Sequence, residues 1–211
     1  MVIELLRTGL HLSMYSKILG KDKVMKRLIR DHGEMELSRK KNAYLHLCLS
    51  ILSQQLSTKV ARVIKDRFLD LYEGKFPTPQ QIIDTPVTTF RGIGFSNAKA
   101  SYIHNVARFA MEQGMEDRKL NKMNDEEVID HLVPIKGVGR WTVEMLLIFT
   151  LGREDVFAVD DLGIQNAMIS LYGIDKTDKK KMKAEMLEIA ERWKPFRSYA
   201  CLYLWKSLDN S

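Results

Sequence analysis

The segment from Pro134 to Gly163 contains two groups of residues whose types and spacing could carry out chemistry. Gly137-Val138-Gly139 forms a tight glycine turn, and an almost wholly apolar stretch typical of a buried helix follows it over 140–151. The connection after this helix ends in two neighbouring carboxylates, Asp160 and Asp161. A glycine turn exposes backbone N–H groups and a helix start adds partial positive charge, so together they favour an anion. The segment therefore predicts a phosphate clamp held in a fixed relation to a catalytic carboxylate.

Each of these features also has a purely structural alternative. A dinucleotide site would need a preceding strand and a third glycine, and position 142 is Thr142. A helix, Gly-Val-Gly turn and second helix suit one backbone phosphate without base recognition, but they also form ordinary helix corners. Asp161 could simply cap the helix that follows it, because Asp is a favoured N-cap residue.

Composition sets limits on the class of protein. The length of 211 residues fits one sizeable domain or two small interleaved lobes. Of these residues 45% are hydrophobic and 28% are charged, a composition that argues against long disordered segments. The net charge of +6 attracts polyanions or anionic membranes without choosing between them, and a merely soluble basic protein is an equal alternative.

The sequence predicts no cofactor and no membrane segment. Cys48 and Cys201 provide neither a disulfide framework nor a four-cysteine cluster, and the five histidines lack metal-ligand spacing. No apolar run reaches the roughly 20 residues of a membrane span, and Glu4 and Arg7 interrupt the first residues, which make a poor signal peptide. We expect an intracellular protein, cytoplasmic in a prokaryote or nuclear in a eukaryote.

Periodicity and capping residues predict an all-α protein of about ten short helices. The apolar pattern of residues 1–19 does not exclude a strand. The expected helices cover residues 1–19, 22–32, 43–53, 58–74, 80–84, 86–90, 96–113, 125–133, 140–151, 162–172, 178–192 and 195–205. The buried faces of two of them are expected to carry Val60, Val63, Ile64, Phe68 and Leu71, and Met182, Met186, Leu187 and Ile189. A second glycine turn, Gly92-Ile93-Gly94, is expected to be a helix corner rather than another phosphate turn.

Four segments in this order resemble one family. They are Ile51-Leu-Ser-Gln-Gln-Leu-Ser, Leu132-x-x-Ile-Lys-Gly-Val-Gly-Arg-Trp-Thr, Asp155-Val-Phe-x-Val-Asp-Asp, and Glu191-Arg-Trp-Lys-Pro-Phe-Arg-Ser-Tyr-Ala-x-x-Tyr-Leu-Trp205. Over about residues 22–206 the chain resembles the helix-hairpin-helix–GPD superfamily of DNA glycosylases, and within it the alkylpurine branch of DNA-3-methyladenine glycosylase II. The resemblance implies one compact domain with lobe A over about 37–120 and lobe B over about 1–36 plus 121–211. The active site would lie in the cleft between these lobes.

The implied activity is base excision from duplex DNA. A monomeric enzyme would flip out an alkylated purine, such as 3-methyladenine or 7-methylguanine, and hydrolyse its N-glycosidic bond. Asp161 matches the catalytic aspartate of the family, with Asp160 as the alternative if the register shifts by one. A fixed carboxylate suits this reaction because positive charge develops on the sugar as the bond breaks. A non-catalytic binder of damaged or bent DNA, and a glycosylase for another damaged base, are the alternative functions.

The resemblance also implies a base pocket and a mechanism without lyase chemistry. Trp141 occupies the position where the bifunctional members of the superfamily carry a Schiff-base lysine, so water is the expected nucleophile. Indole stacks well on a cationic alkylated purine, a contact that contributes about 0.5–2 kcal/mol. A structural role is the alternative for each tryptophan. The implied pocket consists of Trp141, Trp205, Asp160, Leu162, Met145 and Tyr44; at Leu162 and Met145 the bacterial enzyme of this branch often has Tyr, which leaves the breadth of substrates open.

Two further segments match DNA-contacting positions of the family. Gln54, Gln55 and Leu56 match the loop that fills the gap left by the flipped base, and Gln55 aligns best with the inserting residue. The implied phosphate-binding hairpin consists of Lys136, Gly137, Val138, Gly139, Arg140 and Thr142. No catalytic metal is implied, and a monovalent cation on the hairpin backbone, as in relatives, is left open.

Overall fold

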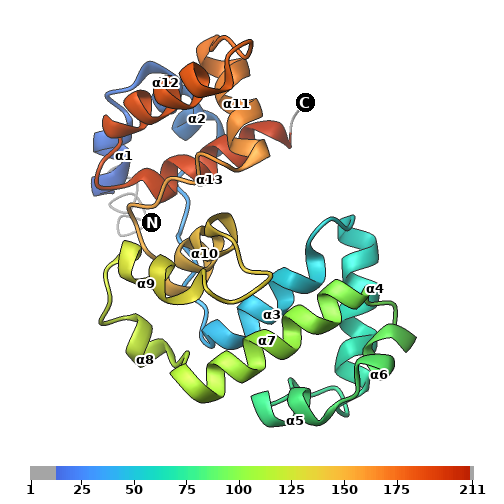
Figure 1. Ribbon diagram of the computed structural model, residues 1–211. Helices are drawn as coiled ribbons and strands as arrows, with labels where there is room; N and C mark the ends of the chain where they lie inside the picture. The colour runs from blue at the N-terminus through green and yellow to red at the C-terminus, as the bar shows by residue number, and fades with distance from the viewer. Residues whose placement is uncertain (1–12, 210–211) are drawn as a thin grey trace, which may run out of the picture. The chain divides into compact units, whose positions relative to one another are not determined.

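The computed structural model describes residues 13–209, and these residues form thirteen α-helices and one π-helical segment without a strand. The all-α prediction is confirmed. Among the described residues, no helix combines the length and the apolar character needed to cross a membrane. The chain divides into two compact units (Figure 1). We call Ser38–Arg153 the central unit, and the segments up to Leu37 and from Glu154 the terminal unit.

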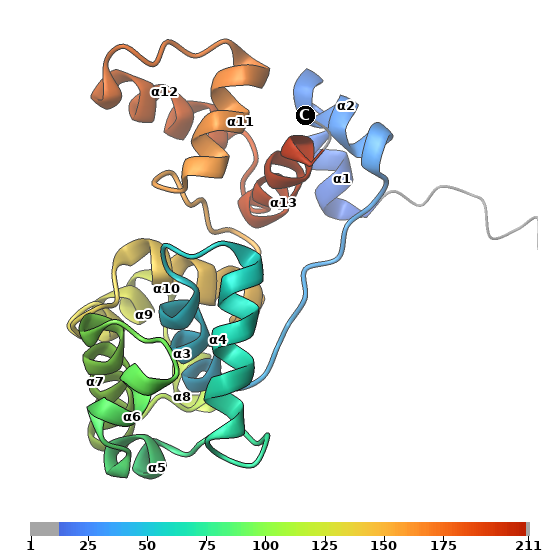
Figure 2. The same cartoon turned by 90° about the vertical axis from the view of Figure 1, so that its right-hand side faces the viewer.

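Within residues 13–209, the terminal unit contains five helices. They are α1 (Met14–Leu19), α2 (Lys23–His32), α11 (Leu162–Tyr172), α12 (Lys179–Glu191) and α13 (Arg197–Leu208). Helix α13 packs against both α11 and α2, so the N-terminal and C-terminal segments share one core (Figure 2). The hydroxyl of Tyr203 on α13 donates to the carbonyl of Gly33 at 2.7 Å, which ties these distant segments together. Trp193 lies fully buried in this core.

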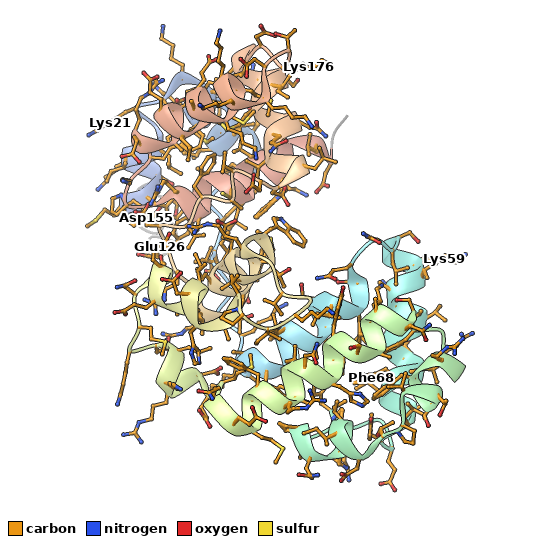
Figure 3. All side chains as sticks on the ribbon, viewed as in Figure 1. Lys21, Lys59, Phe68, Glu126, Asp155 and Lys176 are labelled. Carbon is orange, nitrogen blue, oxygen red and sulfur yellow. The ribbon has the colours of Figure 1, made fainter. Side chains whose placement is uncertain are left out.

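The central unit contains the remaining helices. They are α3 (Ala43–Ser53), α4 (Thr58–Asp70), α5 (Pro79–Asp84), α6 (Val87–Gly92), α7 (Asn97–Gln113), α8 (Asp117–Leu120), α9 (Asp125–Leu132), α10 (Arg140–Leu146) and the π-helical η1 (Leu147–Leu151). The long helix α7 packs against α3, α5 and α6 (Figure 1). Phe68 is fully buried on α4, where its ring lies 5.8 Å from that of Phe95 (Figure 3).

Local sequence explains where the helices begin and end. Ser57 accepts a hydrogen bond from the backbone N–H of Val60, and Asn124 forms a reciprocal capping box with Glu127. These contacts satisfy N–H groups that lack a partner inside the helix. Gly173 closes α11 in the left-handed conformation, with φ of 69°. The helix starts expected at residues 58 and 125 and the helix end expected at residue 172 are confirmed.

The expected division into lobes differs from the structure, and part of the first expected helix cannot be compared with it. Residues 121–153 belong to the central unit, not with the terminal segments, because α10 packs on α3 and α9. The predicted lobe boundary near 120 therefore lies at 153. Residues 1–12 of the first expected helix lie outside the described residues, and α1 begins at Met14.

Two predicted buried faces were too wide. On α4, Val60 and Val63 are 44% and 43% exposed, and Leu71 just after the helix is 36% exposed. On α12, Leu187 is 44% exposed. Each helix contacts its unit along a narrower stripe than the apolar pattern suggests, so the pattern overestimates the contact.

The connection over 154–161 is fixed to the first turn of α13. Ser198 is fully buried; its hydroxyl accepts from the backbone N–H of Val156 at 2.9 Å and donates to the Val156 carbonyl at 3.3 Å. Arg197 makes a two-point contact with Asp155, with Nε–Oδ1 and Nη2–Oδ2 distances of 2.7 and 3.0 Å. These contacts hold the chain that leads to Asp160 and Asp161.

We expect Ser198→Ala to lower the free energy of unfolding by about 1–3 kcal/mol, because the buried N–H of Val156 loses its acceptor. Urea denaturation of wild type and variant measures the change. Ser101→Ala, at an exposed position on α7, is the matched control and should leave the midpoint nearly unchanged. Equal midpoints for the two variants would contradict a role of Ser198 in fixing the connection.

Candidate functional site

Asp161 is the last residue before α11 and caps that helix. Its Oδ1 accepts a hydrogen bond from the backbone N–H of Ile164 at 2.9 Å. The same oxygen accepts a second hydrogen bond from the indole Nε1 of Trp205, on α13, at 2.8 Å. Asp161 is only 9% exposed. The structure therefore brings together two predicted site residues that lie 44 positions apart in the sequence.

Gly163, which sequence analysis did not identify, makes room for this contact. A Cβ atom built on Gly163 would lie 3.0 Å from Asp161 Oδ1 and 3.1 Å from Trp205 Cδ1. These contacts are tighter than most Cβ contacts, so a side chain at position 163 would require the carboxylate or the indole to shift by a few tenths of an ångström. The signal in the sequence is a glycine in the first turn of a predicted helix, and its meaning depends on the partner helix.

Asp160 has different surroundings from Asp161. Its side chain is 47% exposed and pairs with Lys183 on α12. Leu162 is 68% exposed. The two adjacent carboxylates are therefore inequivalent, because Asp160 faces a full positive charge at the surface and Asp161 accepts neutral N–H donors in a buried position.

The predicted hairpin consists of α9, the turn over 133–139 and α10. Gly137 has φ of 103°, and a Cβ there would lie 2.2 Å from the ring of Tyr102 on α7. Only glycine allows both the backbone conformation and this close approach. Asn105, also on α7, donates to the carbonyl of Lys136 at 3.3 Å. Helix α7 thus packs against the hairpin through Tyr102 and Asn105.

The start of α10 leaves its backbone N–H groups without a side-chain cap among the described residues. Gly139 occupies the cap position, and a Cβ there would meet no atom within 4 Å. Such a helix start can accept an anion directly on its N–H groups. Lys136 is exposed beside it, whereas Val138 is buried.

Two of the side chains that were predicted to contact phosphate are engaged inside the protein. Arg140 pairs with Glu126 on α9 and with Glu144 on α10, the latter at 3.1 Å. These carboxylates raise the pKa of Arg140, and the contact with Arg140 lowers the pKa of Glu126. The charge of Arg140 is thus largely neutralised within the hairpin. Thr142 is 3% exposed and lies inside the unit.

The predicted wedge loop is tied to the hairpin. Gln54 Nε2 donates to the carbonyl of Gly137 at 3.4 Å and to Thr142 Oγ1 at 3.5 Å. Gln55 is exposed and has φ of 58°, and Leu56 is half-buried. Gln54 is therefore a tether between the two segments, and Gln55 is the residue that projects.

Lys99 is a second supporting residue that sequence analysis missed. Its Nζ donates to the carbonyl of Leu52 at 2.8 Å, in the last turn of α3 before the wedge loop. Burial lowers the pKa of Lys99. A helix-end carbonyl needs such a donor, but nothing in the sequence indicates that residue 99 supplies it.

The predicted pocket residues of the central unit lie in two places. Trp141 is 37% exposed on the first turn of α10, and Met145 lines a cavity of about 280 Å³. Helices α3, α10 and η1 form its walls, and the polar lining includes His46, Ser50 and Ser53. Tyr44 lines a separate cavity of about 330 Å³ beside Asp117, so the structure does not bring it together with Met145 in one cavity. Its ring packs against Phe76, in the core of the unit.

Helices α9 and α10, with the glycine turn that joins them, define a helix-hairpin-helix protein. The family model described as HhH-GPD superfamily base excision DNA repair protein matches residues 48–194. The chain belongs to this superfamily.

One relative and two solved structures match almost the whole chain. DNA-3-methyladenine glycosylase 1 of Schizosaccharomyces pombe is 37% identical over 211 residues, which cover 98% of this chain and 89% of the relative. The 3-methyladenine DNA glycosylase of S. pombe solved in complex with abasic DNA has a TM-score of 0.82 at 36% identity, covering 92% and 96% of the two chains. The structure of a DNA-3-methyladenine glycosidase from Bacillus halodurans has a TM-score of 0.81 at 35% identity, covering 92% and 89%.

Substitutions at the two hairpin glycines should have different effects on stability. We expect Gly137→Ala to destabilise the protein by more than about 1 kcal/mol, because it adds a clash with Tyr102 to an unfavourable backbone conformation. Gly139→Ala should leave the unfolding midpoint within about 0.5 kcal/mol of wild type, because the position is open. Thermal and urea denaturation measure both variants. Equal destabilisation by the two substitutions would contradict the described turn.

Proposed function

We propose that this protein is a DNA glycosylase that flips an alkylated purine from the duplex and hydrolyses its N-glycosidic bond. The observation that carries the proposal is the buried carboxylate of Asp161, oriented by the start of α11 and by Trp205. Relatives named as 3-methyladenine glycosylases support the same substrate class. The proposal takes the protein as a monomer that acts on double-stranded DNA without a cofactor.

The role proposed for Asp161 follows from the charge of the transition state. Breaking the bond between base and sugar builds positive charge at C1′ of the sugar. A negative carboxylate that is already oriented stabilises this charge without having to reorganise during the reaction. An alkylated purine carries a formal positive charge and leaves as a neutral base, so the reaction needs no strong general acid.

Water is the nucleophile in this proposal. Trp141 stands at the position that would carry an amine in a glycosylase with lyase activity, and indole cannot form a Schiff base. Its ring is 37% exposed, so it is accessible to a cationic purine, which stacks favourably on indole. The product is then an abasic site in an uncut strand.

DNA contact is proposed for the hairpin and the wedge loop. The uncapped start of α10 offers backbone N–H groups to one phosphate, and Lys136 adds an exposed positive charge. Gln55 projects from the loop to occupy the gap left by the base, and Gln54 ties this loop to the hairpin. Because Arg140 is already paired with two carboxylates, we assign it to the stability of the hairpin and not to a phosphate.

The central prediction concerns Asp161→Asn. Asn is as good an N-cap as Asp and can accept from both N–H donors through its amide oxygen, so the fold should be retained. Loss of the negative charge should lower the release of 3-methyladenine and 7-methylguanine from methylated DNA by at least about 100-fold. Single-turnover assays with purified protein measure the rate.

Asp178→Asn is the matched control, because Asp178 caps α12 in the same way and lies outside the proposed site. It should release bases at the wild-type rate. A wild-type rate for Asp161→Asn would refute the catalytic assignment. Tight binding to abasic duplexes with no release of any base by wild-type protein would favour a non-catalytic DNA binder.

The product of the reaction tests the choice of water. We expect wild-type protein to leave the strand intact until alkali cleaves the abasic site, and borohydride should trap no covalent protein–DNA complex. Denaturing gels with and without alkali, over a panel of alkylated, deaminated and mismatched duplexes, measure both the chemistry and the preferred lesion. Strand cleavage before alkali treatment, or a trapped complex, would contradict a monofunctional enzyme.

A further inference from the structure

We infer that Trp205 is a positioning residue whose indole N–H, and not only its ring, orients the carboxylate of Asp161 for the reaction. The inference rests on the proposed function and deepens it. Its starting point is the hydrogen bond from Trp205 Nε1 to Asp161 Oδ1 at 2.8 Å.

Two donors from different helices converge on one oxygen. The backbone N–H of Ile164, in the first turn of α11, reaches Oδ1 at 2.9 Å, and the indole of α13 reaches the same atom. The backbone contact alone keeps the side chain at the helix start, as in any N-cap. The second donor, the indole of Trp205, restrains Oδ1 from α13, independently of α11. Together the two hydrogen bonds restrict rotation of the Asp161 carboxylate about its side-chain bonds.

The neutral character of the donor suits the reaction. Indole N–H donates a hydrogen bond but brings no positive charge. It can therefore orient the carboxylate without cancelling the negative charge that the transition state requires. The neighbouring Asp160 shows the contrast, because Lys183 places a full positive charge on it.

The packing around the pair shows that this approach is built into the fold. The missing side chain of Gly163 leaves room for the indole to lie against Asp161, since a Cβ there would lie 3.3 Å from Trp205 Nε1 and 3.0 Å from Asp161 Oδ1. Tyr203 and Leu204, which precede Trp205 on α13, are fully buried and fix the helix. Trp205 itself is half-buried.

The test separates the N–H from the ring. Incorporation of 3-benzothienylalanine at position 205 replaces the N–H by sulfur and keeps the size and shape of the side chain. We expect the single-turnover rate of 3-methyladenine release to fall about 10- to 100-fold, because a hydrogen bond to a charged group is lost. The dissociation constant for a duplex with a stable abasic analogue should stay unchanged.

Trp193 provides the matched control. Within residues 13–209 its indole nitrogen has no hydrogen-bond partner, so the same analogue at position 193 removes no contact. It should leave the rate, the affinity and the unfolding midpoint at wild-type values.

A substitution at Gly163 tests the same contact by changing the space between the indole and the carboxylate. Gly163→Ala should separate indole and carboxylate and lower the rate to a similar extent, again with unchanged affinity for the abasic duplex. A wild-type rate with benzothienylalanine at 205 would overturn the inference and leave Trp205 as a ring of the pocket. Equal losses of rate and affinity would also overturn it, since they indicate a structural role. Wild-type protein that releases no base would instead refute the proposed function, and the inference with it.

Discussion

The hydrogen bonds on Oδ1 of Asp161 impose the strictest requirement on the terminal unit. They require the start of α11 and the end of α13 to meet at one atom, and a glycine at position 163 leaves room for this close approach. The start of α11 depends on the connection over 154–161, which Ser198 and the Arg197–Asp155 pair fix to the first turn of α13. The start of α13 therefore fixes the connection that leads to Asp161, and Trp205 near the end of the same helix contacts the Asp161 carboxylate. Helix α13 thus determines the position of this carboxylate through two separate sets of contacts.

In the central unit, the proposed phosphate contact depends on backbone groups and not on a charged side chain of the turn. Gly137 packs against the ring of Tyr102 on α7, so this helix fixes the position of the hairpin turn. Glu126 and Glu144 neutralise Arg140, which leaves the uncapped N–H groups of α10 as the main anion-binding feature of the turn. Such groups recognise a phosphate and not a base, as a repair enzyme that scans many sequences requires.

Local signals were sufficient to predict several helix ends, because a cap depends on residues three or four positions apart, but the helix expected over 58–74 ends at Asp70 and α8 was not predicted. Ser57, Asn124 and Gly173 act as their types and spacing indicated. The faces of the helices were harder, since the exposure of Val60 and Val63 depends on which neighbours α4 meets. The support of the site by Lys99 and Gly163, and the separate location of Tyr44, depend on contacts between residues far apart in the sequence, and no periodicity encodes such contacts.

The alternative interpretations of Asp161 prove to be compatible. Its side chain does cap α11, as an ordinary N-cap aspartate does. Capping, however, is also what removes rotational freedom from the carboxylate before any substrate arrives, and the indole of Trp205 removes more. The same two contacts occupy Oδ1 with neutral donors, so they restrain the group without cancelling its charge. In the proposed mechanism a helix cap can also serve as the catalytic group, because an uncharged donor directs the buried carboxylate of Asp161, whereas Asp160 is exposed and paired with Lys183.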